Sequence, residues 1–175
     1  MERIESRIGI DIGRVIIDGD GPDTSFFGSD EESLRVPAVE GAFEAVAQVV
    51  RAFQGRVWLV SKCGSKIQQR TLRWLLAHDF YAQTGVSEHN LRFCKERPQK
   101  ALHARQLGLT HFIDDRVDVL LALEGVVGNR YLFGPQKRPA PRGLTPVEAW
   151  RDLLAILALA PAPNAPRRPT DPARV

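Results

Sequence analysis

Cysteine is scarce in this sequence, because only Cys63 and Cys94 occur among 175 residues. Two cysteines are too few for a disulfide framework, so the sequence favours a reducing compartment. Long apolar runs are missing as well, and none approaches the roughly 20 residues that a membrane-spanning helix needs. Residues 1–7 alternate in charge and hold no apolar stretch of the kind found in secretory signals. We therefore expect a cytoplasmic protein with no membrane partner.

The chain also has little net charge. Its formal charge is +3 at pH 7, and two of these charges come from residues 161–175, which hold three arginines and one aspartate. The remainder is nearly neutral, so the composition does not support general nucleic-acid binding. Residues 161–175 are rich in proline and alanine and lack apolar residues for packing, so we expect a disordered tail. Residues 1–160 have the length of a single domain.

Short apolar runs that end in turn signals alternate with segments of helical spacing. The runs predict buried strands at 8–12, 57–60, 91–94, 111–113 and 131–133. Apolar spacing and start and stop signals predict helices at 42–53, 65–76, 98–108, 117–123 and 145–159. This alternation indicates an α/β fold, a Rossmann-like three-layer sandwich with a mainly parallel sheet and helices on both faces.

Two helix starts and one connection carry further signals. Ser65 is expected to cap its helix, with an apolar face ending at Leu76. Thr145 is expected to cap the last helix, with Pro146 in its first turn. The apolar residues 15–17 and the Gly- and Asp-rich stretch 18–30 predict a hairpin or small flap with a mobile tip.

Polar side chains follow three of the expected strands. Asp11 ends the first, Ser61 the second, and Asp114 and Asp115 a later one. Because parallel strands end at the same edge of a sheet, we expect these groups to meet there. Clustered acids repel each other unless a cation compensates them, and Mg²⁺ is a hard cation that also holds phosphate. Lys100 can supply positive charge for a phosphoryl group; the lysines that compete for this role are Lys62, Lys66 and Lys95.

Four segments, in order, resemble the motifs of the haloacid-dehalogenase-like (HAD-like) superfamily. Residues 10–15 (Ile-Asp-Ile-Gly-Arg-Val) are similar to its first motif, which begins with a nucleophilic aspartate. Residues 57–61 are similar to the second, an apolar strand closing on serine or threonine. Lys100 fits the third, and residues 112–118 resemble the fourth, with acids at the strand end and one turn later. The resemblance covers roughly residues 7–135.

This resemblance implies a magnesium site around the nucleophile. Asp11 would form an aspartyl-phosphate and also ligate Mg²⁺. The backbone carbonyl of Gly13 and the carboxylate of Asp114 would be further ligands. Asp115 and Asp118 would complete or orient the metal shell, and the roles of Asp114 and Asp115 are interchangeable at this stage.

The resemblance also implies a phosphate-binding set. Ser61 would hydrogen-bond the phosphoryl oxygens, and Lys100, or Lys95 in its place, would neutralise developing charge. Lys62 and Arg14 are further substrate-binding candidates. An electropositive mouth of the site would draw on Arg14, Arg92, Arg97 and Arg116.

One position departs from the family pattern. The family's phosphatases carry a second aspartate two residues after the nucleophile, as general acid and then base, and here that residue is Gly13. Losing a positioned acid–base group costs about 10²–10⁴-fold in rate. Asp18 and Asp20 lie nearby, but their spacing does not assign them this role. The sequence therefore favours a Mg²⁺-dependent phosphohydrolase or phosphotransferase, with a phosphate- and metal-binding regulatory module that has weak or no activity as the alternative.

The lengths between the motifs exclude a large cap domain. Residues 12–38 and 62–99 each have room only for a flap or a crossover. Capless members of the family imply bulky substrates, such as nucleotides, nucleic-acid ends or phosphoproteins, and a homo-oligomer is another way to cover the site. Specificity is expected to come from residues 18–36 and 80–98.

Overall fold

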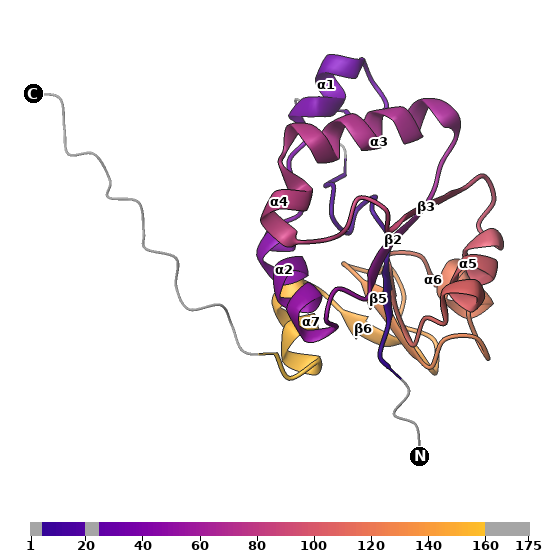
Figure 1. Cartoon of the computed structure of the whole chain (residues 1–175). Helices are drawn as coiled ribbons and strands as arrows, with labels where there is room; N and C mark the ends of the chain where they lie inside the picture. The colour runs from indigo at the N-terminus through magenta and orange to yellow at the C-terminus, as the bar shows by residue number, and fades with distance from the viewer. Residues whose placement is uncertain (1–4, 20–24, 160–175) are drawn as a thin grey trace, which may run out of the picture.

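The computed structural model describes residues 5–19 and 25–159. Its centre is a six-stranded sheet in the order β3-β2-β1-β4-β5-β6 (Figure 1). Every neighbouring pair of strands runs parallel. The strands are β1 (Ile8–Ile10), β2 (Val57–Lys62), β3 (Leu91–Cys94), β4 (His111–Asp114), β5 (Asn129–Phe133) and β6 (Thr145–Val147). The expected α/β class with a mainly parallel sheet is confirmed.

Helices cover both faces of this sheet. They are α1 (Asp30–Arg35), α2 (Ala42–Ala52), α3 (Ser65–Ala77), α4 (Phe80–Thr84), α5 (Gln99–Leu107), α6 (Val117–Ala122) and α7 (Trp150–Ile156). Figure 1 shows α1 to α4 and α7 on one side, and α5 and α6 on the other. This arrangement is the expected three-layer sandwich.

The central strands β1 and β4 are buried on both faces, as parallel strands between two helical layers must be. Ile8 and Ile10 belong to the core that includes residues of α2 and α7, whereas Phe112 and Leu132 belong to the core under α5 and α6. Between the two isoleucines, Gly9 leaves room for the second core, since a Cβ there would lie 2.6 Å from the Phe112 ring.

The chain order creates a switch point in the middle of the sheet. From β1 the chain builds outward through β2 and β3, and then crosses to β4 and builds outward in the other direction. Ligands of open parallel sheets bind beyond the carboxyl ends of the strands at such a point. Here it lies between β1 and β4, where Asp11 donates its backbone N–H to the Ile113 carbonyl over 2.9 Å.

The flap after β1 has a short hydrogen-bonded base. Asp18 donates its backbone N–H to the Pro37 carbonyl, and Val39 donates to the Ile16 carbonyl. The flap contains α1, which the sequence did not indicate and which begins with a capping box between Ser29 and Glu32. The expected mobile tip includes residues 20–24, and the expected disordered tail is 161–175; both lie outside the described residues.

The last helix was expected over residues 145–159, and this expectation is wrong for its first residues. Thr145 does not cap a helix, because residues 145–147 form β6 and α7 begins only at Trp150. Pro146 pairs with Leu132 on the outermost strand. Proline is tolerated there because an edge strand leaves one row of N–H groups unpaired.

The expected cap and apolar face of α3 also need correction. Ser65 is the first helical residue, Gly64 is the cap, and no side chain caps the helix. Leu76 is 60% exposed. The buried face of α3 instead consists of Arg70, Thr71, Trp74 and Leu75.

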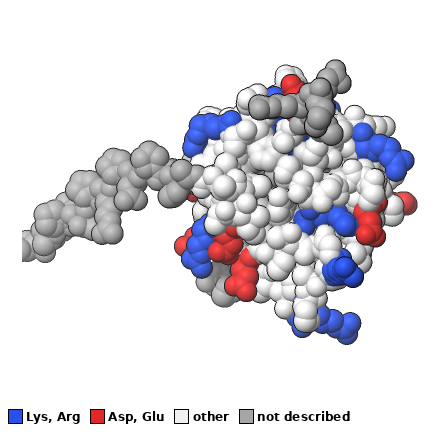
Figure 2. All heavy atoms as spheres, turned by 90° about the horizontal axis from the view of Figure 1, so that it is seen from below, with Lys and Arg blue, Asp and Glu red and all other residues white. Residues whose placement is uncertain are grey.

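No helix of the described part of the chain is long and apolar enough to cross a membrane. Figure 2 shows the molecule from below. Among the residues coloured there, basic and acidic side chains are interspersed, and neither kind forms a continuous band across this face.

Candidate functional site

Three carboxylates meet at the switch point between β1 and β4. Asp11 follows β1, Asp114 ends β4 and Asp115 comes directly after it. One oxygen from each of the three lies within 4.8 Å of the other two. Asp114 is 0% exposed and Asp11 is 7% exposed, whereas Asp115 is half-buried. We call these residues the acidic trio.

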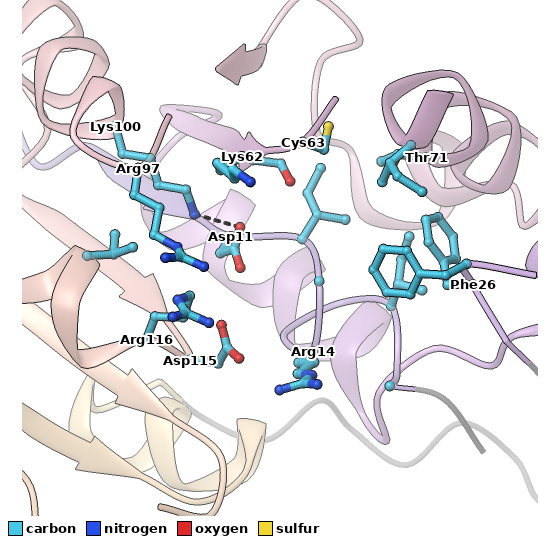
Figure 3. Close-up of a pocket in the computed structure, with 18 of the residues that line it drawn as sticks. Asp11, Arg14, Phe26, Lys62, Cys63, Thr71, Arg97, Lys100, Asp115 and Arg116 are labelled. Atoms are coloured by element: carbon cyan, nitrogen blue, oxygen red, sulfur yellow. Dashed lines mark hydrogen bonds and ion pairs between the residues drawn. The ribbon is translucent and has the colours of Figure 1, made fainter. Parts of the chain in front are cut away.

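Lys100 joins two members of the acidic trio. Its Nζ donates to Asp11 Oδ1 and to Asp114 Oδ2, over 2.7 Å in each case. The residue comes from α5 and is 2% exposed. Lys95 precedes α5 and is exposed, and so are Lys62 and Lys66. Among the competing lysines, the structure therefore brings Lys100 to the acids (Figure 3).

Burial and charge act against each other in this group. Burial disfavours the Lys100 ammonium, but the Asp11 and Asp114 carboxylates outweigh it and raise the lysine pKa. Burial and the Asp11 charge raise the pKa of Asp114 to about 8, although Lys100 opposes this. Burial and Asp11 also raise the pKa of Asp115, while Arg14 and Arg116 lower it. The nearby cations therefore do not fully compensate the negative charge of the acidic trio.

Ser61 lies beside the acidic trio on β2, the strand next to β1. The residue is 8% exposed, and its carbonyl oxygen accepts a weak hydrogen bond from Cys94 Sγ. Within the described residues its hydroxyl has no hydrogen-bond partner. Because Ser61 lines the cleft described below, a hydroxyl without a protein partner is available there to a ligand.

These groups line a cleft of about 380 Å³. Asp11, Ser61, Lys100 and Asp115 contribute to its wall, together with Gly13. Four further cations also line it, namely Arg14, Lys62, Arg97 and Arg116. Figure 3 shows Arg97 and Arg116 on the same side of Asp11 as Lys100. Of the phosphate-binding candidates, Arg14, Ser61, Lys62 and Lys100 line the cleft, and Lys95 does not.

Two of the expected residues lie apart from this centre. Asp118 does not join the acidic trio: its side chain is 53% exposed and forms ion pairs with Arg97 and Arg116. Arg92, expected at the electropositive mouth, is not among the residues that line the cleft and donates to the His89 carbonyl. Asp18 lines the cleft, and Asp20 lies outside the described residues.

The turn that carries Gly13 is fixed by its neighbours. Ile16 and Ile17 donate their backbone N–H groups to the Ile12 carbonyl, and Arg14 donates to the Ile17 carbonyl over 2.7 Å. Arg14 has φ of 61°, in the left-handed region that side chains rarely adopt. Strained residues of this kind are concentrated at functional sites.

Sequence reasoning missed the opposite wall of the cleft. Phe26, Phe27 and Thr71 line it, and none was singled out. It also missed Arg70, whose side chain is buried on α3 and donates to the Phe26 carbonyl and to Asp30. Only the tertiary fold reveals these roles, because the flap has no periodicity and an arginine on a helix usually faces solvent.

The Cys63 thiol also lines the cleft, but it is not activated. Burial, with smaller contributions from Cys94 and Asp11, raises its pKa to about 11. A nucleophilic cysteine needs the opposite shift.

No protein-family model matches the sequence, and no curated protein matches it either. The function therefore has to be inferred from the residues of the site.

Proposed function

We propose that this protein is a Mg²⁺-dependent phosphohydrolase or phosphotransferase of HAD-like type that acts through an aspartyl-phosphate on Asp11. The observation that carries the proposal is the position of Lys100, which bridges Asp11 and Asp114 at the switch point. A carboxylate beside a buried ammonium and a second acid is suited to attack on a phosphoryl group.

The residues present fit a magnesium ion. All three members of the acidic trio offer carboxylate oxygens, the ligands that Mg²⁺ prefers. When they are ionised they carry three negative charges, of which Lys100 compensates one. The remaining two match a divalent cation. Bound there by Asp11, Asp114 and Asp115, the ion would neutralise phosphoryl charge and orient the substrate.

The protein groups have separate tasks in the proposed reaction. One oxygen of Asp11, Oδ1, accepts from Lys100, and the carboxylate attacks phosphorus while the bond to the leaving alcohol oxygen breaks. Ser61 donates to a phosphoryl oxygen, and Lys100 offsets the charge that develops. Attack by water on the aspartyl-phosphate then releases inorganic phosphate, and attack by a second alcohol would instead transfer the group. The leaving oxygen needs a proton.

Gly13 favours a second candidate. This position lines the cleft and carries no side chain that could supply that proton. The same site would then bind phosphate and metal as a regulatory module with little or no turnover. The two candidates differ in rate, and they share their ligands.

The first experiment measures release of inorganic phosphate from phosphorylated metabolites, nucleotides, phosphopeptides and phosphorylated oligonucleotides. Wild-type protein is compared with Asp11→Asn, each with Mg²⁺ and with excess EDTA. We expect turnover that requires both Mg²⁺ and Asp11, and a phosphorylated protein intermediate after acid quenching. Turnover that persists in Asp11→Asn would refute the nucleophile. Binding of Mg²⁺ and inorganic phosphate without any turnover would establish the regulatory module.

A second experiment restores the missing acid. A Cβ at Gly13 meets nothing within 4 Å, and its φ is outside the left-handed region. Gly13→Asp should therefore fold and raise kcat by about 10²–10⁴-fold if proton transfer limits the wild-type rate. Gly64→Asp is the matched control, because Gly64 also lines the cleft with open space at its Cβ. Equal effects of both substitutions would show that the added charge, and not its position, matters.

A further inference from the structure

The cleft has two chemically different walls. Beside Asp11, one side carries Lys100, Arg97 and Arg116 (Figure 3). The opposite side carries aromatic and aliphatic groups, with Phe26 labelled in the same view. Phe26, Phe27, Ile17 and Ile67 all line the cleft. A ligand that fills it therefore meets charge on one side and apolar surface on the other.

Phe27 is the most exposed large apolar side chain of the described residues, at 70%. Burying such a side chain is worth about 1.5–3 kcal/mol. Phe27 lines the cleft with further apolar residues, and contiguous exposed apolar surface is typical of a ligand-binding groove. Its ring meets the Phe26 ring edge to face, with 6.2 Å between centroids and 84° between planes. Two rings in this arrangement offer a surface for a further ring.

The aromatic wall is held in place from α3. Arg70 Nη1 donates to the Phe26 carbonyl over 3.0 Å, and Arg70 Nε donates to Asp30 Oδ1 over 2.8 Å. Arg73 Nη1 donates to the other oxygen of Asp30 over 3.0 Å. Arg70 is only 3% exposed. The segment that carries Phe26 and Phe27 is thus anchored at both ends, which lowers the ordering cost of binding.

Size and charge restrict the ligand further. A volume of about 380 Å³ lies at the lower end of small-molecule sites. Within the described residues, Arg14 and Lys62 form no ion pair, and Arg97 and Arg116 share one acid, Asp118. Against the acids Asp18, Asp115 and Asp118, these four cations leave one positive charge in excess at the mouth for a small anion.

We propose that the substrate is a small phosphate monoester whose alcohol part carries a planar aromatic group, as in a nucleoside or aryl phosphate. This inference rests on the proposed function. The phosphoryl group sits at Asp11, Ser61 and Lys100, and the ring lies against Phe27 and Phe26. The reaction is the transfer described above: the bond from phosphorus to the ester oxygen breaks, and the aromatic alcohol leaves with a proton from solvent.

The test compares substrates that differ only in the ring. Benzyl phosphate is paired with cyclohexylmethyl phosphate, and uridine 5′-monophosphate with ribose 5-phosphate, so that the leaving oxygen belongs to a primary alcohol in every case. We expect the aromatic member of each pair to have a kcat/KM about 10-fold higher, as stacking on an aromatic side chain provides. The preference should collapse in Phe27→Ala and return in Phe27→Trp. Leu76→Ala is the matched control, because Leu76 is 60% exposed and does not line the cleft.

A binding measurement distinguishes a failure of this inference from a failure of the proposed function. Each pair is also titrated calorimetrically into Asp11→Asn protein in the presence of Mg²⁺. Phe27-dependent binding of the aromatic members, without turnover by the wild type, would support the ligand class and overturn the enzyme. Turnover of both members of each pair at equal kcat/KM would support the enzyme and overturn the ligand class. Neither binding nor turnover of any member would overturn both.

Discussion

Replacing Lys100 by methionine tests the central interaction of the site. Methionine keeps much of the length and removes the charge. Lys100 is 2% exposed, and its Nζ lies 2.7 Å from both Asp11 and Asp114. The substitution leaves two buried carboxylates without their cation. Removing one partner of a buried ion pair typically costs about 3–5 kcal/mol in the free energy of unfolding.

The size of this loss should depend on pH. The pKa of Asp114 is already raised from 3.8 to about 8 in the folded protein, and losing Lys100 raises it further. A carboxyl with a raised folded pKa costs no stability below its unfolded pKa, and the cost grows as pH rises towards the folded value. Lys100 stays charged over this range, because both carboxylates raise its pKa. Wild type and variant share this cost up to about pH 8, where Asp114 ionises in the folded wild type. The Asp114 part of the loss therefore appears only above about pH 8, and there it grows by up to about 1.4 kcal/mol per pH unit.

The measurement is urea unfolding in EDTA at pH 6.5 and pH 9.5, followed by tryptophan fluorescence. Trp74 and Trp150 are fully buried and report on the core. Lys62→Met is the matched control, because this exposed lysine lines the same cleft, and its effect should stay within about 0.5 kcal/mol. An equal loss at both pH values, or one below about 1 kcal/mol at pH 9.5, would refute the reasoning, since a buried pair should lose more.

Three further outcomes are expected. Free Mg²⁺ at 100 times its Kd should stabilise the wild type by about 2.7 kcal/mol. Asp115→Asn should need a higher Mg²⁺ concentration for the same stabilisation. Calorimetric Tm values that do not depend on Mg²⁺ would contradict both expectations. Gly9→Ala should cost about 1–3 kcal/mol in urea unfolding, because the new Cβ would lie 2.6 Å from the Phe112 ring; an unchanged stability would show that the sheet yields there. Burial raises the pKa of Cys63 to about 11, which lowers its thiolate fraction at pH 8. In a Cys94→Ser background, iodoacetamide should therefore modify Cys63 on the order of 100-fold more slowly in native than in urea-unfolded protein. Equal rates would refute this assignment of the thiol.

The position of the acids was predictable from the sequence for a physical reason. Asp11 and Asp114 each follow an apolar run too short for a helix, and parallel strands present their ends at one edge. That rule needs no knowledge of which strands are neighbours. The structure adds that β1 and β4 are adjacent, which brings the carboxylates within 4.8 Å of each other.

Local patterns failed where a tertiary contact decides the outcome. Thr145 followed by Pro146 is a strong helix start signal, yet pairing with β5 along the open edge makes this segment a strand. Lys95 and Lys100 are equivalent by composition, and only the placement of α5 buries one and exposes the other. Phe27 carries no local signal for its place in the cleft wall, because that place depends on the tertiary contact between Arg70 and the Phe26 carbonyl.

The distribution of charge within the cleft bears on how the proposed ligands bind. The cations Arg14, Lys62, Arg97 and Arg116 are exposed, whereas Asp11 and Asp114 are buried. A phosphate ester is attracted to this mouth and then meets buried carboxylates of the same sign. When the acidic trio is fully ionised, Lys100 compensates only one of its charges, so a close approach of the phosphoryl group to Asp11 requires a second cation. On the proposed function, the charge of the site alone makes magnesium and phosphate bind more tightly together than separately.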